Sequence, residues 1–343
     1  MTGIRTSAVF TPESTFGVTP GSPTWYRFPT GLEITYQPKN NMNEYREIGN
    51  KFIDRVVAGV FSGSGTVTFK LDYDCINFLG WVFESYSFDN TNKIHTFQKA
   101  NGKRVKSASI RTKKLNRIVG GNKDEMVILK GCVCTDFQCN WGGRDAVSTC
   151  TVQFEYVNET EDTSNLSSTD WDVFYDEEGA GYSGGTVHPV EWACLNIGDD
   201  PVAFTESVAF GVSNSVSMIK GCGTRFYGNY NEGQANIKLT TTCYSYTPDN
   251  YYSRMYSGGD SIALTSPKAK NLQPIPIVKI KSSETGGTTE YSMTVTFTRV
   301  YVESPGSRSF NTGSRINDSP SLKATNFKIE INNANDSAIS IWN

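Results

Sequence analysis

The sequence predicts a mostly β protein built from two related halves, each carrying one helix. Residues 65–75 align with residues 233–243 at a constant offset (239 − 71 = 168), and both segments alternate polar and apolar side chains with the period of half-buried strands. The aromatic share of 12%, led by Tyr and Phe, also favours pleated surfaces over helices.

A second pair of matching segments supports a duplication. Residues 150–157 resemble residues 293–300, at an offset of 293 − 150 = 143, and a Gly-Gly pair precedes each of them. One match of this length could arise by chance, but two matches in the same order are better explained by an internal repeat.

The helices and the end of the chain are predicted from spacing and turn residues. Apolar side chains recur at helical spacing in residues 73–84, so we expect a helix there. Its counterpart should begin near residue 248, where Pro and Asp provide a first turn and a cap. Residues 327–331 and 338–342 are expected to form a hairpin that docks on the rest of the protein.

Composition divides the chain into four segments. We expect a first domain over residues 1–157 with an N-terminal arm over 1–27, an acidic Gly-rich linker over 158–189, a second domain over 190–303, and a polar C-terminal extension over 304–343.

The overall composition excludes several classes of protein. The net charge of −3 argues against polyanion binding by the whole molecule, and no apolar run approaches the ~18–20 residues that a membrane span requires. The first residues lack the apolar core of a signal peptide, so secretion is not expected. The eight cysteines are therefore expected to be reduced and to serve as small buried residues. Cys132, Cys134 and Cys139 lack the paired spacing of a zinc site, and we predict no metal and no cofactor.

Catalytic constellations are hard to build from this chain, and an enzyme is not predicted. There are only two histidines, His95 and His188, and both are expected to be plain strand or surface residues. No nucleophile elbow, phosphate-binding loop or dinucleotide fingerprint is present. A glycosidase site needs only two carboxylates, so it stays open, but no particular pair is indicated.

Charge is segregated along the chain. A basic block with no intervening acid comprises Lys103, Arg104, Lys106, Arg111, Lys113, Lys114 and Arg117. No Lys or Arg occurs over residues 145–218, which hold many acids. The blocks could be solvated surface, could meet across a subunit interface and orient assembly, or, for the basic block, could bind nucleic acid. Calcium binding by the acids of residues 170–178 does not fit the spacing of a calcium loop.

Several short motifs resemble a known family. They are residues 11–20 (TPESTFGVTP), residues 48–50 (IGN), a strand over residues 63–72, and the FLG at residues 78–80. The chain resembles viral (phage-type) tail tube proteins, most clearly over residues 11–85 and, through the repeat, over about 11–303. We interpret it as a duplicated, two-domain form.

The resemblance implies an architecture and a role. Each half would be a tail-tube-like β-sandwich or half-barrel with a flanking helix. Subunits would self-assemble into rings that stack into a tail tube, the conduit for delivery of genome DNA into the host cell, and other tail proteins would cap the tube. A duplicated chain would form a homotrimer, a pseudo-hexameric ring. The protein would be a virion component made in the host cytoplasm, without a membrane anchor.

Two sets of site residues follow. The long connection over residues 38–62 corresponds to the family's loop between rings, so we predict contacts with the next ring by Glu44, Tyr45, Arg46, Glu47 and Arg55, with Arg225 in the second half. The polar sides of the repeat strands are expected to face the lumen, and they comprise Thr66, Thr68, Lys70, Asp72, Gln234, Asn236, Lys238 and Thr240. We expect Asp72 or Glu155 to neutralise Lys70.

The main alternative is a β-rich carbohydrate-binding or adhesive surface protein. Exposed Trp and Tyr would then act as stacking platforms, and glycosylation sequons at Asn158, Asn165, Asn317 and Asn335 would suit it. Rings or tubes of the purified protein would favour the tube, whereas isolated monomers would favour the alternative.

Overall fold

The computed structural model of the 343-residue chain describes residues 6–29, 33–45, 53, 55–73, 75–118, 121–141, 148–161, 194–197, 200–201, 205–244, 274–286, 289–304 and 317–332.

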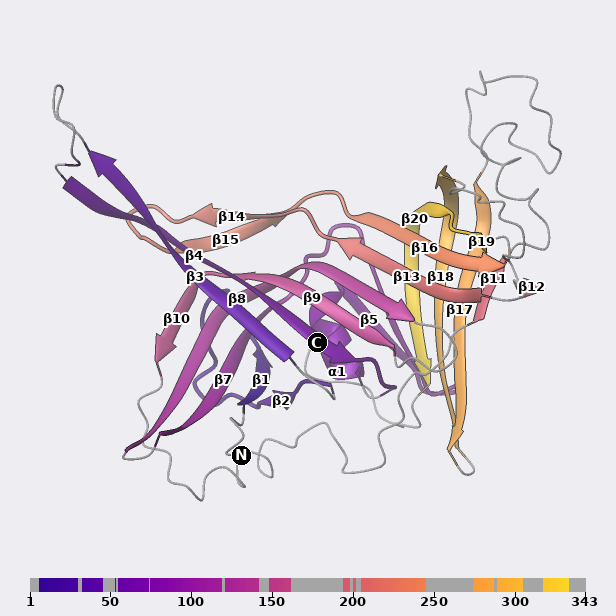
Figure 1. Cartoon of the computed structure of the whole chain (residues 1–343), viewed down its shortest axis with the longest axis horizontal. Helices are drawn as coiled ribbons and strands as arrows, with labels where there is room; N and C mark the ends of the chain where they lie inside the picture. Colours follow the sequence, from indigo (N-terminus) through magenta and orange to yellow (C-terminus); the bar gives the residue numbers. More distant parts are fainter. Residues whose placement is uncertain are drawn as a thin grey trace, which may run out of the picture.

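Strands make up most of the described chain, as the sequence predicts, with one helix among them (Figure 1). The elements are β1 (Thr6–Pro12), β2 (Tyr26–Arg27), β3 (Glu33–Tyr45), β4 (Arg55–Lys70), α1 (Ile76–Val82), β5 (Ser85–Asp89), β6 (Ile94–Gln98), β7 (Ser107–Ile118), β8 (Gly121–Trp141), β9 (Thr149–Tyr156), β10 (Asn158–Glu161), β11 (Cys194–Ile197), β12 (Asp200–Pro201), β13 (Thr205–Ser213), β14 (Val216–Lys220), β15 (Tyr227–Glu232), β16 (Asn236–Tyr244), β17 (Ile275–Gly286), β18 (Thr289–Ser304), β19 (Asn317–Asp318) and β20 (Ser321–Asn332).

One antiparallel sheet runs through both halves of the chain. Neighbouring strands within this sheet follow the order β3-β4-β9-β8-β13-β16-β20-β18-β17-β11. The first part of β8 also pairs with β7 and β10, and β7 pairs with β1, which pairs with β2. The sheet is therefore branched, and the described strands do not close into a barrel.

The predicted repeat strands are present, but their neighbours differ between the halves. The first repeat segment lies in β4 and the second in β16, while the other matching pair lies in β9 and β18. β4 pairs directly with β9, whereas β20 lies between β16 and β18. The duplication itself stays a prediction.

β20 also changes the expected picture of the C-terminal extension. Over residues 328–331 it pairs with β18 along one edge and with β6 along the other. Both edges of β20 are therefore occupied over these four residues. Residues 338–342, like the helix expected near residue 248, lie outside the described residues.

The helix lies within the predicted range, at Ile76–Val82, and all but one of its residues are buried. It packs on the apolar side of the sheet, where the Phe78 and Phe69 rings meet at 4.7 Å between centroids. The Trp81 indole N–H donates to the Cys132 carbonyl oxygen at 3.1 Å, which satisfies a buried donor.

The core side of the sheet is continuous from β4 to β20. One row across it consists of Phe69, Cys150, Cys139, Phe210, Leu239 and Leu322, each opposite the next and all buried. Cross-strand partners share a face, so the apolar sides of both repeat strands form one core. The predicted domain boundaries at residues 157, 189 and 303 stay predictions. Strands from both halves and from the C-terminal extension pair with one another.

Several single-residue predictions can be compared with the structure. Cys75, Cys132, Cys134, Cys139 and Cys150 are buried as expected, whereas Cys222 is exposed, so burial was wrong for that residue. His95 is a strand histidine, fully buried on β6 and hydrogen-bonded through Nδ1 to the Tyr86 hydroxyl at 3.0 Å.

The packing of Phe154 against Gly65 is directly testable. A Cβ at Gly65 would lie 2.3 Å from the Phe154 ring and 2.8 Å from the Thr35 carbonyl oxygen. We expect Gly65→Val to lower the free energy of unfolding by about 1–3 kcal/mol in urea titrations. Ser64→Val, at the exposed neighbouring position, should change it by less than about 0.5 kcal/mol. Equal stability of the two variants would contradict this packing.

Candidate functional site

The side of the sheet opposite the core is polar across seven strands, from β3 to β20, and we call it the polar face. One row across it runs Thr68, Thr151, Gln138, Gly211, Lys238, with Glu33 and Lys323 at its ends. The next row runs Thr66, Gln153, Asp136, Ser213, Asn236. The polar sides of the two repeat strands are thus parts of one surface.

The predicted lumen residues divide into seven that fit this surface and one that does not. Thr66, Thr68, Lys70, Gln234, Asn236, Lys238 and Thr240 are exposed or half-buried on or next to the polar face. Asp72 is 1% exposed, so its assignment to a solvent-facing side was wrong. β4 ends at Lys70, and the strand alternation used for the prediction does not extend to Asp72.

The expected neutralisation of Lys70 by Glu155 is also wrong. Glu155 lies opposite Ser64, and Lys70 lies opposite Thr149, six residues further along the strand. At ~3.3 Å per residue the two positions are about 20 Å apart. Burial raises the pKa of the Glu155 carboxyl and that of the Asp136 carboxyl from their ordinary values.

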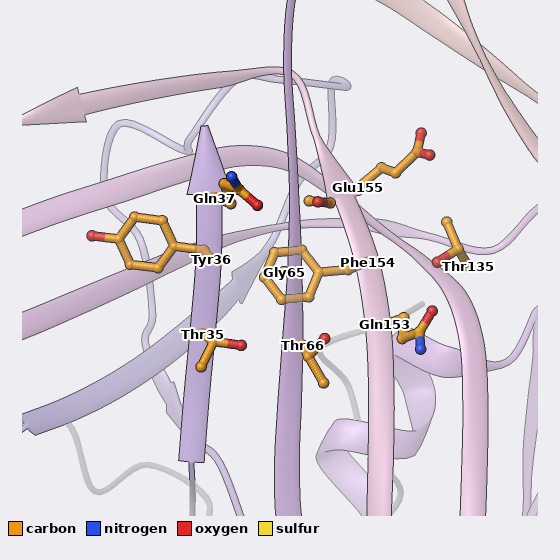
Figure 2. A pocket seen from close by; sticks show the side chains of 10 residues that line it. Thr35, Tyr36, Gln37, Gly65, Thr66, Thr135, Gln153, Phe154 and Glu155 are labelled. Carbon is orange, nitrogen blue, oxygen red and sulfur yellow. The ribbon is translucent and has the colours of Figure 1, made fainter. Parts of the chain in front are cut away.

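A shallow depression of about 660 Å³ lies over β3, β4 and β9 (Figure 2). It is lined by Thr35, Tyr36, Gln37, Ser64, Gly65, Thr66, Thr135, Gln153, Phe154 and Glu155. Thr135 is the extra residue of a bulge in β8, between Cys134 and Asp136. Hydroxyl and amide groups dominate the lining, and one carboxylate contributes to it, so the depression is wet and carries little charge.

The predicted inter-ring connection is a hairpin arm rather than a loop. β3 continues to Tyr45 and β4 begins at Arg55, so much of residues 38–62 is paired strand. β4 pairs with β9 only over residues 63–70, and within the described residues its stretch over 55–62 pairs with β3 alone. We call residues 39–45 and 55–62 the first arm, which extends away from the sheet in Figure 1.

The tip of the first arm exposes large side chains. Met42, Tyr45 and Val56 are 64%, 57% and 50% exposed. Glu44 and Arg55 are exposed beside them, whereas Arg46 and Glu47 lie outside the described residues. Exposed apolar side chains on a two-stranded hairpin are typical of a surface that binds another chain.

A second hairpin, β14 with β15, runs beside the first arm and contacts it (Figure 1). The Arg225 side chain donates from Nε to the Gly59 carbonyl oxygen at 3.1 Å and from Nη2 to Asn40 Oδ1 at 2.5 Å. The Phe61 N–H donates to the Arg225 carbonyl oxygen at 3.0 Å. Arg225, predicted to contact the next ring, therefore bonds to its own chain here.

The N-terminal motif has a structural role that spacing alone did not reveal. Glu13 Oε1 accepts hydrogen bonds from the Ser109 hydroxyl at 2.7 Å and the Gly131 N–H at 2.9 Å. Glu13 Oε2 accepts one from the Gly17 N–H at 2.9 Å. One carboxylate thus ties the segment after β1 to β7 and to β8.

A buried ionic cluster joins α1 to the base of β15. The Lys99 ammonium contacts Glu84 and, at 3.0 Å, Glu232 Oε1, and the three side chains are 13%, 4% and 10% exposed. Glu232 Oε2 also accepts from the Val105 N–H at 3.0 Å. Burial raises the pKa of Glu84 to about 7, although Lys99 opposes the shift.

The charge blocks are only partly described. The Arg111 guanidinium lies 4.8 Å from the centre of the Trp25 ring, and Arg104 donates to Asn229. Residues 162–193, which include most of the acidic linker predicted over residues 158–189, lie outside the described residues, so a meeting of the two blocks stays a prediction.

The described residues give little support to the alternative functions. Trp25, Trp81 and Trp141 are buried and provide no stacking platform for sugars. Among these residues no three His, Cys, Asp or Glu side chains are grouped to hold a metal ion. Nor does the described part contain a helix long and apolar enough to cross a membrane.

The described residues thus form a branched β-sheet with one polar face and a protruding arm. The model of the phage tail tube protein family matches residues 3–298, and the chain therefore belongs to that family. The protein is accordingly a structural component of a phage tail. No curated protein matches the chain.

The buried cluster makes stability depend on pH. Because the folded-state pKa of Glu84 is near 7 and the carboxyl's ordinary value is 4.5, the folded chain binds more protons than the unfolded chain between these values. Stability therefore falls as pH rises through that window. From pH 5.5 to 8.5 we expect the wild type to lose about 2 kcal/mol more than Glu84→Gln in urea titrations.

The exposed carboxyl of Glu206 provides the matched control for this effect. Glu206→Gln should follow the wild-type pH profile. If Glu84→Gln also follows that profile, then the Glu84 carboxyl is not held protonated by burial.

Proposed function

We propose that this chain assembles into closed rings that stack into the tail tube, and that phage DNA passes through the lumen without specific binding. The observation that carries the proposal is the polar face. It includes the polar sides of both repeat strands, and the buried core lies on the opposite side of the same strands. The wall of a tube needs one side that contacts water along its whole width and one packed side that excludes water. The protein would act as a wall and not as a catalyst.

We expect each ring to contain three chains. A duplicated chain supplies two tube-like units, so three chains would give six units around a closed ring. Within the described residues β4 is the strand that pairs with β3, so β3 is an edge strand of the described sheet. An edge strand thirteen residues long favours pairing with another chain, and a neighbouring copy in the ring would pair with it.

The chemistry of the polar face suits a lumen. Its rows are made mainly of Thr, Ser, Gln and Asn, and its charges are of both signs, with Glu33 and Asp136 alongside Lys70 and Lys238. Sustained binding of DNA depends on many Lys and Arg contacts to phosphates. A wall with few and mixed charges would hold water and let the nucleic acid move.

The tip of the first arm is our candidate for contact between rings. Glu44, Tyr45 and Arg55 are exposed there, and Arg46 and Glu47 lie in the connection between the strands. The exposed apolar side chains of Met42 and Val56 would be covered when the next ring docks. Other tail proteins would meet the same surfaces at the ends of the tube.

Assembly of the purified protein tests this function. Electron microscopy should reveal rings or tubes, and native mass measurement of isolated rings should give three copies per ring. Six copies would refute the trimer while leaving the tube intact. Monomers only, over a wide range of protein and salt concentrations, would contradict the proposed function.

Thiol labelling tests which side of the sheet faces the lumen. Thr68→Cys and Asn236→Cys would be made in a Cys222→Ser background, because Cys222 is exposed in the natural chain. In intact tubes with capped ends, a maleimide on a large polymer should label neither position. The same variants as dissociated rings should react, which controls for accessibility. Labelling of both positions from outside intact tubes would make this face the exterior.

A further inference from the structure

The β14–β15 hairpin is fixed to the first half of the chain at its root. The Tyr230 hydroxyl donates to the Val105 carbonyl oxygen, and Arg104 donates to the Tyr230 carbonyl oxygen at 3.2 Å while lying 5.8 Å from the centre of its ring. The Phe16 and Tyr230 rings meet at 5.0 Å. Glu232 adds the buried contact with Lys99.

The hairpin is also fixed at its tip, to the first arm near the base of that arm. Arg225 makes its two side-chain hydrogen bonds to Gly59 and Asn40 there, and its carbonyl oxygen accepts the Phe61 N–H. The Phe226 and Phe61 rings lie 6.1 Å apart. The contact therefore combines polar and aromatic groups from both hairpins.

The two attachments are far apart. Arg225 and Glu232 are separated by seven residues, and at ~3.3 Å per strand residue the hairpin bridges about 23 Å from the core to the arm. Along residues 55–62 the strand that pairs with the first arm's β4 is β3 alone among the described residues. A two-stranded hairpin is marginally stable on its own in water, so its direction depends on what else holds it.

We infer that the β14–β15 hairpin is a brace that sets the direction of the first arm, with Arg225 as a positioning residue within its own chain. The inference rests on the proposed function, in which the first arm binds the next ring. An arm that is already held in its binding direction loses less conformational freedom when it docks. The brace thus lowers the protein concentration at which rings stack.

Hydrogen exchange on the unassembled protein tests the brace directly. Arg225→Met keeps a long side chain but removes the two side-chain hydrogen bonds to the first arm, and Lys220→Met changes an exposed cation on the same hairpin. Amides of residues 40–45 and 56–61 should exchange about tenfold faster in Arg225→Met and at the wild-type rate in Lys220→Met. Exchange in Arg225→Met within twofold of wild type would overturn the inference.

Assembly provides the second readout. In Arg225→Met the rings should form normally, while the concentration needed for stacking rises about tenfold. Deletion of residues 42–47 should abolish stacking altogether, since it removes the tip itself. If Arg225→Met prevents stacking without changing exchange in the arm, then Arg225 contacts the next ring and the brace is wrong. If the wild type forms no tubes, the proposed function fails, and the exchange result still decides whether the hairpins are coupled.

Discussion

The pairing of β8 with β13 is the contact on which the rest of the structure depends. It places Cys139 opposite Phe210 and Gln138 opposite Gly211, and so joins strands of the first half to strands of the second. Side chains alternate between the two faces of a strand, so this register merges both apolar sides into one core and both polar sides into one surface. A slip of one residue would turn Phe210 toward water and break that continuity.

Charged groups are buried or half-buried where segments distant in the sequence meet. Glu13 holds the N-terminal segment against β7 and β8, and Lys99 lies between Glu84 and Glu232 at the base of β15. A buried ion pair adds little net stability compared with well-packed apolar side chains at the same place. A buried ion that has lost its partner is strongly destabilising. Such contacts favour one arrangement over its alternatives, and both lie at places where a wrong arrangement would misplace a protruding segment.

Much of the local structure could be predicted from the sequence, and the errors share a cause. The repeat strands, the helix at residues 76–82 and the buried cysteines follow from periodicity, which reports the environment of each side chain along one element. The exposed Cys222 and the buried Asp72 lie in turns or beyond the end of a strand, where alternation no longer applies. The family resemblance predicts a loop where the structure has the paired strands of the first arm. Residues 39–45 are mostly polar and carry no apolar alternation that would predict a strand.

The sequence by itself determined the strands of the repeat segments, which side of each of these strands is apolar, and, through the family match, what class of protein this is. Only the tertiary structure decided which strands are neighbours. The insertion of β20 between β16 and β18, its pairing with β6, and the docking of Arg225 on the first arm join residues that are far apart in the chain. A period-two pattern fixes the face of a side chain but not its partner strand, because any strand with the same alternation offers a compatible edge. Partner choice depends on register, side-chain volume and loop closure across the whole fold, and these become defined only when the core is packed.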